Sequence, residues 1–383
     1  MQDETCRVCR RPLYPEPLLH YDNMPKAAQH FPDAAALSAE HGADLTIRQC
    51  SGCGLVQLAD EPVPYYRDVI RAAGISDVIR DFKTRQFRAF IDRFSLRGRK
   101  VVEIGCGRGE FLSLLDPAIV TACGIEHDAD AVAHCRQHGL RVAKDYLEAG
   151  TVLADGPFDA FLLLMFLEHM PDPNGALHAL HDNLTPGAVG LVEVPNFDMM
   201  LRNQLFSEFI ADHLLYFTAD SLRTTLHTNG FEVLDCGESR DDYVLSAVVR
   251  RRERLDMSRF RQRQAALENE LRRFIGGFGD RRVAVWGAGH QSLAVIALTK
   301  VAASLRYVVD SAPFKQGRFT PATHLPIVPP DALQADPVDA VIVVCGSYSD
   351  EVAGILRRDF DPRLAVAILR ETGLDVVAGG PVT

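Results

Sequence analysis

Short apolar runs alternate with amphipathic segments through the middle of the chain. A run of four to eight apolar residues bounded by turn residues is typical of a strand buried on both faces of a parallel sheet. Helical spacing between the runs begins near Glu110 and again near Asp128. This alternation predicts a doubly wound α/β sheet. The expected strands cover residues 101–104, 122–125, 158–165 and 189–195, with a turn at 184–187 before the last of them.

The first apolar run breaks into a turn of closely spaced glycines. Gly105, Gly107 and Gly109 alternate with Cys106 and Arg108. Glycine allows the backbone to turn sharply and to approach a ligand closely. The turn therefore predicts a ligand above this strand, and the alternative is a tight strand-to-helix connection that binds nothing.

Polar residues follow the ends of these strands. In an open α/β sheet, ligands bind outside the carboxyl ends of the strands. Glu103 and Glu126 offer carboxylates to a ribose or an amino-acid group, and Asp145, His169 and Asn196 lie at or just beyond such ends. We expect these residues to gather at one edge of the sheet.

An amphipathic segment precedes the sheet. Apolar residues recur at helical spacing from Ile79 to about Phe94, which predicts a helix. Before it, Pro62-Val63-Pro64 marks a boundary. The pair Tyr65 and Tyr66 follows at once, either as packing residues or as residues that close a nearby site.

The last third of the chain repeats the strand, glycine turn and helix plan. A charged segment from Arg250 to about Phe274 predicts a connecting helix. The turn Gly287-Ala288-Gly289-His290 then follows an apolar strand. Ser292 stands where the dinucleotide fingerprint has its third glycine, so NAD is not the expected ligand. A nucleotide of another kind or a purely structural role both fit. The expected domains are residues 1–62, 63–250 and 251–383.

Composition limits the partners. The chain has 383 residues and a formal net charge of −10, which argues against broad binding to nucleic acid. No apolar run approaches the roughly 20 residues that cross a bilayer, and the first residues lack the basic-then-apolar plan of a signal peptide. We therefore expect a cytoplasmic protein with a small-molecule substrate and no membrane partner.

Four of the nine cysteines form two CxxC pairs. Each pair presents two thiolates from one tight turn, and four thiolates favour tetrahedral zinc. Because all four positions are cysteines, the ion should be structural. The alternative is a metal-free redox pair. The expected zinc ligands are Cys6, Cys9, Cys50 and Cys53.

A histidine beside a carboxylate follows the sheet. Asp212 and His213 precede Tyr216 in a segment rich in aromatic residues. A histidine with a pKa near 7 is suited to removing a proton from carbon next to a carbonyl. The alternative is a histidine that packs at a helix end. His169, in its Leu-Glu-His box, is either a structural residue or a group that holds an oxyanion.

Three motifs in order resemble those of class I S-adenosylmethionine (SAM) dependent methyltransferases. They are Glu103 with the GxGxG turn, the Leu167-Glu168-His169 box, and Leu-Thr-Pro-Gly before a strand. The resemblance implies that the glycine turn, Cys106 included, cradles the methionine part of SAM. It also implies that Glu126 holds the ribose hydroxyls, and that Asp145 with Tyr146 meets the adenine.

The whole arrangement resembles sugar C-methyltransferases that act on nucleotide-linked keto-sugars in deoxysugar biosynthesis. The resemblance implies zinc at the four cysteines, His213 as the base that forms an enolate, and Asp212 and His169 in support. It also implies a C-terminal Rossmann-like domain that helps to enclose the sugar nucleotide. The residues expected to contact the substrate are Tyr65, Tyr66, Asn196, Tyr216, Tyr243, Gly287, Gly289 and His290.

Two segments depart from that family. Ile210-Ala211-Asp212-His213 stands where Tyr-x-Glu-His is common, so the phenol is missing and the carboxylate is shorter. Residues 239–243 replace a glycine-rich segment. An O- or N-methyltransferase acting on another small metabolite, and a zinc-bearing module without catalysis, are the alternatives. The sugar, its nucleotide, the methylated carbon and the oligomeric state stay open.

Overall fold

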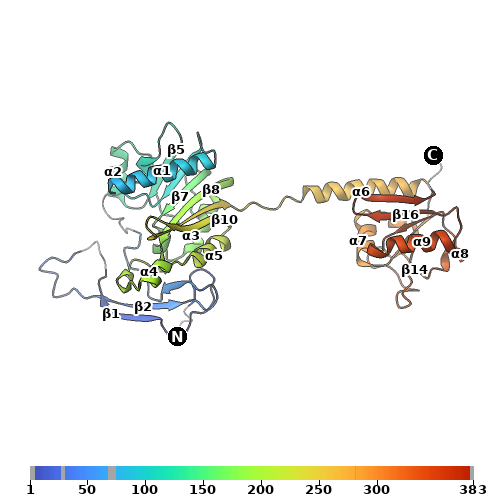
Figure 1. Ribbon diagram of the computed structural model, residues 1–383, viewed down its shortest axis with the longest axis horizontal. Helices are drawn as coiled ribbons and strands as arrows, with labels where there is room; N and C mark the ends of the chain where they lie inside the picture. Colours follow the sequence, from blue (N-terminus) through green and yellow to red (C-terminus); the bar gives the residue numbers. More distant parts are fainter. Residues whose placement is uncertain (1–4, 27–30, 68–74, 281, 380–383) are drawn as a thin grey trace. The chain divides into compact units, whose positions relative to one another are not determined.

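The computed structural model describes residues 5–26, 31–67, 75–280 and 282–379. The chain forms two compact units, Met1–Arg254 and Leu255–Thr383 (Figure 1). The expected connecting helix is α6 (Ser258–Gly276), which lies entirely in the second unit. It begins later than the expected Arg250, because residues 250 and 251 still pair within a strand of the first unit. The division of the first unit near residue 62 stays a prediction, because both parts share one hydrophobic core.

A seven-stranded sheet forms the centre of the first unit. Its order is β10-β11-β8-β7-β4-β5-β6. The five strands from β4 to β8 are parallel, and β11 runs antiparallel to both β8 and β10. This confirms the α/β doubly wound class. The strands are β4 (Lys100–Ile104), β5 (Thr121–Glu126), β6 (Val142–Lys144), β7 (Phe158–Leu164), β8 (Leu184–Pro195), β10 (Phe231–Ser239) and β11 (Val244–Arg251).

Two expectations about local structure were wrong. The helix expected from Glu110 is a single 3-10 turn, η1 (Leu112–Leu114). The turn expected at 184–187 lies within β8, where Leu184 already pairs with Phe158. The register shifts before Val189, and Gly187 has a φ of 72°. The glycine therefore makes an irregularity inside a strand and does not separate two elements.

Alternate strand residues pack on opposite faces of this sheet, as a period of two requires. Val101 faces one core cluster, with Phe87 and Phe90 of helix α1 (Asp77–Arg93). Val102 faces the other cluster, with Leu177 of helix α3 (Pro173–Asp182). Helix α1 thus confirms the amphipathic pattern. The remaining helices of the unit are α2 (Ala129–Gln137), α4 (Phe197–Asn203) and α5 (Ala219–Thr228), with short 3-10 turns η2 (Leu167–His169) and η3 (Phe206–Glu208).

An ion pair is buried between α1 and the sheet. The Lys83 ammonium contacts the Glu193 carboxylate on β8, and both side chains are at most 3% exposed. Gln86 donates to the other Glu193 oxygen at 2.6 Å. The second hydrogen bond offsets part of the cost of burying two charges.

A four-stranded antiparallel sheet carries the N-terminal cysteines. Its order is β1 (Leu19–Met24), β2 (Ala43–Gln49), β3 (Val56–Leu58) and β9 (Leu215–Tyr216). The last strand comes from the far side of the sequence, two residues after His213. The N-terminal sheet is therefore completed by the segment that carries the candidate base.

The second unit has a six-stranded sheet of order β14-β13-β12-β15-β16-β17. All of its strands are parallel except β17, as the repeated strand and helix pattern predicts. Its strands are β12 (Val283–Trp286), β13 (Leu305–Val309), β14 (Ile327–Val328), β15 (Ala340–Val343), β16 (Ala365–Arg370) and β17 (Gly373–Ala378). Its other helices are α7 (His290–Leu298), α8 (Ala332–Ala335) and α9 (Ser349–Asp359), with 3-10 turns η4 (Ala302–Ser304) and η5 (Gly346–Tyr348).

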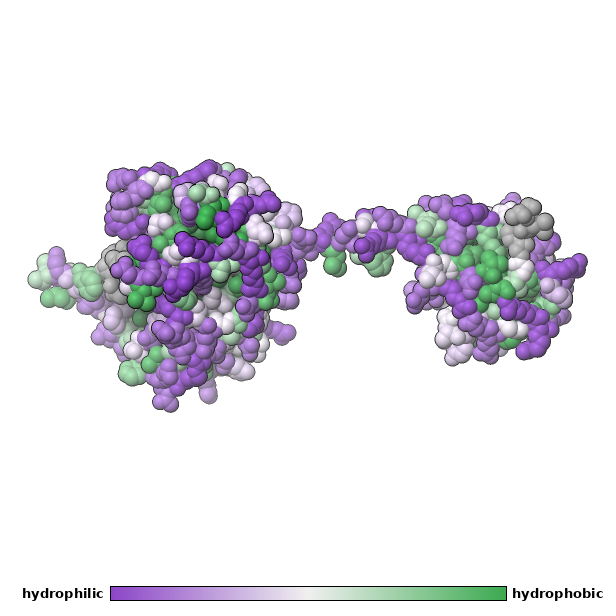
Figure 2. All heavy atoms as spheres, turned by 45° about the horizontal axis from the view of Figure 1, so that its top comes forward, coloured by the Kyte–Doolittle hydropathy of each residue, from purple (hydrophilic) through white to green (hydrophobic). Residues whose placement is uncertain are grey.

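Hydrophilic residues dominate the face of the first unit in Figure 2. Within the part of the chain that the structure describes, none of the helices combines the length and the apolar character that a membrane crossing requires.

Candidate active site

The glycine turn leaves β4 in a conformation that side chains rarely adopt. Gly105, Gly107 and Gly109 have φ values of 65°, 57° and 83°. A Cβ on Gly105 would lie 2.6 Å from the Phe166 ring, and one on Gly109 would lie 2.3 Å from Leu140. Both positions are therefore closed to larger residues. The Cys106 side chain is buried in this turn, with its sulfur 3.9 Å from the Gly107 carbonyl oxygen.

Glu126, at the end of β5, is fixed beside the turn. Its carboxylate accepts hydrogen bonds from the backbone N–H groups of Gly107 at 2.8 Å, His127 at 2.7 Å and Asp128 at 2.9 Å. Asp145 follows β6, and its N–H donates to the Glu126 carbonyl at 3.0 Å. The two acids thus end neighbouring strands, as their spacing predicts, and Glu103 is fully buried within β4.

An aromatic wall centred on Tyr146 lies next to these acids. Tyr66, His127 and Phe166 contact its ring edge-on, with centroids at 6.1, 5.8 and 6.2 Å. Tyr66 and Tyr146 are site residues predicted from the sequence, whereas His127 and Phe166 were not predicted. Their positions in the sequence could have indicated them, because both follow the carboxyl end of a strand: His127 comes directly after the acid that ends β5, and Phe166 comes two residues after β7. A flat ring such as adenine is suited to such a wall.

His169 and His213 come together beyond the carboxyl end of β7. Their ring centroids are 4.8 Å apart, at an interplanar angle of 72°. Nδ1 of His169 lies 2.8 Å from the Asp212 carbonyl oxygen, so it carries a proton. Nε2 of His169 then faces Glu168, whose nearest carboxylate oxygen is 3.9 Å away.

The His213 ring is held in its neutral form. Burial, assisted by the neighbouring His169, lowers the pKa of His213 to about 3. Its Nδ1 is buried and has no hydrogen-bond partner among the residues that the structure describes. The expectation from the sequence was a histidine with a pKa near 7. The difference arises because the local sequence does not reveal how far the ring is removed from water.

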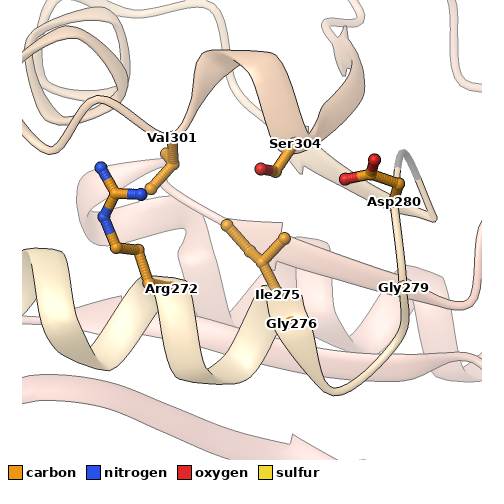
Figure 3. Close-up of a pocket in the computed structure, with 7 residues that line it drawn as sticks. All are labelled: Arg272, Ile275, Gly276, Gly279, Asp280, Val301 and Ser304. Atoms are coloured by element: carbon orange, nitrogen blue, oxygen red, sulfur yellow. The ribbon is translucent and has the colours of Figure 1, made fainter.

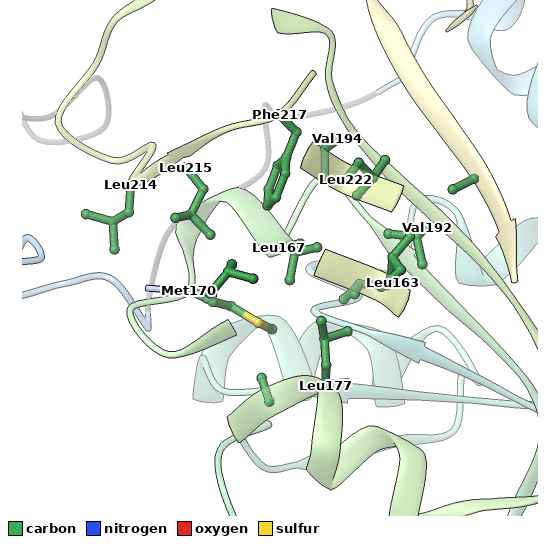
Figure 4. Packing of buried hydrophobic residues seen from close by; sticks show 14 of the residues in the cluster. Leu163, Leu167, Met170, Leu177, Val192, Val194, Leu214, Leu215, Phe217 and Leu222 are labelled. Atoms are coloured by element: carbon green, nitrogen blue, oxygen red, sulfur yellow. The ribbon is translucent and has the colours of Figure 1, made fainter. Parts of the chain in front are cut away.

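The loop that carries His213 is tied down on both sides. The N–H of Leu214 donates to the Glu168 carbonyl at 2.8 Å, and the N–H of Leu58 donates to the Leu214 carbonyl at 3.0 Å. Figure 4 shows Leu214, Leu215 and Phe217 in the same buried cluster as Leu167 and Met170 of the η2 region. His213 is thus held between η2 and the N-terminal sheet.

Tyr65 brings a phenol to Asp212. Its hydroxyl donates to Oδ1 of Asp212 at 2.7 Å and also contacts the Lys26 carbonyl oxygen. Burial and this hydrogen bond raise the pKa of Tyr65, which keeps the phenol protonated. The family pattern has a tyrosine two residues before the acid, whereas here a tyrosine from a distant segment contacts the acid.

Three other expected substrate residues are engaged within the protein. The side chain of Asn196 caps α4 at Met199 and donates to the Asp242 carbonyl at 2.7 Å. The Tyr216 hydroxyl accepts from the Ile210 N–H at 3.1 Å and lies 3.3 Å from its carbonyl oxygen. The Tyr243 hydroxyl donates to Glu208 at 3.2 Å. Contact of any of these with a substrate stays a prediction.

The four N-terminal cysteines converge. The four sulfurs all lie within 4.8 Å of one another, including pairs at 3.6 Å (Cys6 and Cys53) and 3.3 Å (Cys9 and Cys50). Tetrahedral zinc with Zn–S bonds of about 2.3 Å needs sulfurs about 3.8 Å apart, so the donor set fits. Backbone N–H groups also point at the sulfurs of Cys6 and Cys50, at 3.2 to 3.5 Å.

In the second unit, the glycine turn faces an acid. A Cβ on Gly287 would lie 2.5 Å from the Val344 carbonyl oxygen. The N–H of Ala288 donates to Asp310 at 2.8 Å, and Lys315 pairs with the same carboxylate oxygen at 2.8 Å. Gly289 caps α7, and His290 begins it on the surface. These residues lie at the carboxyl ends of β12 and β13.

A separate cavity of about 250 Å³ lies at the opposite ends of the same strands (Figure 3). It is lined by Arg272, Ile275, Gly276, Gly279, Asp280, Val301 and Ser304. None of the expected substrate residues contributes to it. The expected nucleotide turn and this cavity are therefore distinct features of the second unit.

Comparison with known proteins identifies the class. Residues 79–235 match the model of a methyltransferase domain, and residues 250–361 match that of a C-methyltransferase C-terminal domain. Together with the strand order, the glycine turn and Glu126, these matches define a SAM-dependent methyltransferase.

Individual proteins resemble different lengths of the chain. C-methyltransferase NovU from Streptomyces niveus is 24% identical over an alignment of 387 positions, gaps included, which covers 91% of each chain. A ubiquinone biosynthesis O-methyltransferase from Methylococcus capsulatus is 37% identical over 128 residues, which cover 32% of this chain and 53% of that protein. This chain thus spans about half the length of that relative. A solved SAM-dependent methyltransferase from Clostridium acetobutylicum superposes with a TM-score of 0.39 at 14% identity, over 49% of this chain and 96% of that one.

Proposed function

We propose that the protein methylates a carbon atom of a nucleotide-linked keto-sugar. His213 removes the proton next to the ketone, and the resulting enolate takes the methyl group of SAM. Similarity to a C-methyltransferase along 91% of the chain supports carbon as the acceptor. The match to a C-methyltransferase C-terminal domain supports the same choice.

The observation that carries the proposal is the position of the His213 ring, 4.8 Å from the His169 ring beyond the carboxyl end of β7, where burial keeps it neutral. A proton acceptor must keep its lone pair at working pH, and the lowered pKa of His213 ensures this. Such a low pKa also makes a weak base. A developing enolate oxygen beside the ring would raise the pKa again, because a nearby negative charge favours the imidazolium.

Asp212 and His169 support the base. The Asp212 carbonyl fixes the proton of His169 on Nδ1. His169 can donate to an oxyanion from Nε2 only when both ring nitrogens carry a proton, and the Glu168 carboxylate lies 3.9 Å from that nitrogen. Tyr65 holds the Asp212 side chain through its phenol.

The cofactor residues follow the expected order. SAM, when bound, supplies an electrophilic methyl group. Gly105, Gly107 and Gly109 would hold its methionine part at the turn, and the Glu126 carboxylate would accept a hydrogen bond from the ribose. Asp145 and Tyr146 meet the adenine, with the Tyr146 ring as the centre of the aromatic wall.

Zinc at the four cysteines completes the proposal for the first unit. We expect one zinc per chain, and Cys50→Ser should lower zinc content and thermal stability together. Ser51→Ala, which leaves all four thiolates in place, is the matched control. A stable Cys50→Ser protein with full zinc would refute the four-thiolate site.

The second unit supplies the nucleotide contact in this proposal. Gly287, Gly289 and His290 offer an open turn and a helix N-terminus, which suit a phosphate group. The domain division at residues 62 and 250 is part of the same proposal.

Mass spectrometry tests the function. Incubation with SAM and a panel of nucleotide-linked keto-sugars should give a product heavier by one methyl group. His213→Ala should lose turnover by about 10²-fold or more and keep its affinity for S-adenosylhomocysteine. Unchanged turnover would remove His213 from the role of base.

Methylation of oxygen or nitrogen is the second candidate, favoured by the similarity of 128 residues to an O-methyltransferase. In that reaction no C–H bond breaks. Deuterium exchange at the carbon next to the ketone, measured in heavy water without SAM, separates the two. An active enzyme that leaves this carbon unexchanged would count against the enolate route.

A further inference from the structure

Two adjacent residues that precede the seven-stranded sheet in the sequence contact two different parts of the candidate site. The segment Tyr65-Tyr66-Arg67, here called the strap, makes a tight turn in which the Tyr66 N–H donates to the Val63 carbonyl at 3.0 Å. The Tyr65 hydroxyl lies on Asp212, beside the base. The Tyr66 ring lies against Tyr146, on the aromatic wall.

Arg67 fastens the second end of the strap. Its guanidinium carbon lies 5.4 Å from the Tyr66 ring centroid and 5.3 Å from that of Tyr146. It also pairs with Glu148 at 2.7 Å. The strap thus contacts the Tyr146 ring twice, through the Tyr66 ring and the Arg67 guanidinium, and the ion pair with Glu148 holds Arg67 in place.

We propose that the strap couples occupancy of the adenine site to the position of Asp212. The proposal rests on the proposed function only in treating Tyr146 as an adenine contact. An adenine on the wall adds packing area for Tyr66 and Arg67, which favours the closed strap. Because Tyr65 is covalently next to Tyr66, the same closure brings its phenol to Asp212.

Coupling of this kind is reciprocal. If adenine favours the bond between Tyr65 and Asp212, then that bond must favour adenine by the same factor. Loss of the Tyr65 hydroxyl should therefore weaken cofactor binding, although the hydroxyl points at Asp212 and not at the wall. A purely local role for Tyr65 gives no such effect.

Calorimetry with S-adenosylhomocysteine tests the coupling without an acceptor. Tyr65→Phe should weaken binding by about 3- to 10-fold, the range expected for the loss of one ordinary hydrogen bond. Tyr66→Ala should weaken it by about 10-fold or more. The double variant should fall short of the product of the two factors, since both changes open the same strap.

The matched control is Tyr14→Phe. Tyr14 is also in the N-terminal module, is 51% exposed, and its hydroxyl has no hydrogen-bond partner within the described residues. The affinity of Tyr14→Phe for S-adenosylhomocysteine should equal that of the wild type. Wild-type affinity in a folded Tyr65→Phe protein, or factors that simply multiply in the double variant, would overturn the coupling.

Turnover gives the second readout. At saturating SAM, Tyr66→Ala should lose turnover by about the factor that Tyr65→Phe loses, and Tyr66→Phe should restore most of it. A Tyr66 that only binds adenine would change KM for SAM and leave kcat intact, which refutes the coupling. If the wild type methylates no keto-sugar, the calorimetric result still stands, so the two proposals fail separately.

Discussion

Tyr216→Phe removes one hydroxyl from the loop that carries the candidate base. The ring itself stays, with its contacts to Phe209 at 4.9 Å and Phe197 at 5.7 Å. The change leaves the N–H and the carbonyl group of Ile210 without the partner they have now. Each ordinary hydrogen bond contributes about 1 kcal/mol, and the longer one at 3.3 Å contributes less. The expected loss is therefore about 1–2 kcal/mol.

That loss should appear in two measurements. A unit of this size loses about 2–4 °C of Tm for each kcal/mol, so Tm should fall by about 2–8 °C. The hydrogen bonds close the loop of residues 210–216, which contains His213, so opening of the loop becomes more favourable by the same free energy. Turnover should fall by up to about 5- to 30-fold, at about 1.4 kcal/mol for each factor of ten.

Affinity for S-adenosylhomocysteine should stay unchanged, because Tyr216 does not contact the glycine turn or the aromatic wall. Tyr21→Phe is the matched control. Its ring also packs on Phe209, at 6.0 Å, and its hydroxyl makes no hydrogen bond with any part of the chain that the structure describes. A lower Tm with wild-type turnover would refute the link between this loop and the base.

Three further outcomes are expected. Glu126→Ala should weaken S-adenosylhomocysteine binding by about 10- to 100-fold, because the ligand would lose one or two hydrogen bonds to a charged group. Calorimetry measures this loss, with the exposed Asp130→Ala variant as the control. Lys83→Met should destabilise the first unit by about 3–5 kcal/mol in urea unfolding, because it leaves the Glu193 charge buried, and a loss below 1 kcal/mol would contradict this. The folded unit should lose stability as pH falls from about 6.5 toward 3, since its His213 binds a proton less readily than an unfolded histidine does. His213→Asn should flatten that pH dependence of Tm, and parallel curves would show that another group causes it.

The local pattern of the sequence predicts much of this fold. Apolar runs identify β4, β5, β7 and β8, and helical spacing identifies α1, because each pattern reflects burial of one element at a time. They do not identify the three-residue strand β6. The same reasoning failed at residues 184–187. Proline and glycine there read as a turn, whereas pairing of Leu184 with Phe158 keeps the segment in the sheet.

Local sequence patterns could not predict the contacts between segments that are distant in the sequence. Tyr65 and Asp212 are 147 positions apart, and the departure from the family motif at Ile210 gave no hint of where a phenol would come from. The pairing of β9 with β3 was equally hidden, since a strand of two residues has no periodicity to read. The lowered pKa of His213 depends on burial by several elements at once.

The two-residue strand β9 has a consequence for engineering. Removal of residues 1–62 would take away Val56 and Gln57, so Tyr216 and Leu215, which follow the candidate base His213, would lose their pairing partners. The segment is therefore not a detachable accessory of the catalytic sheet. A chimera that exchanges N-terminal modules between related enzymes would also have to exchange residues 210–217. These two segments are distant in the sequence but form one structural unit.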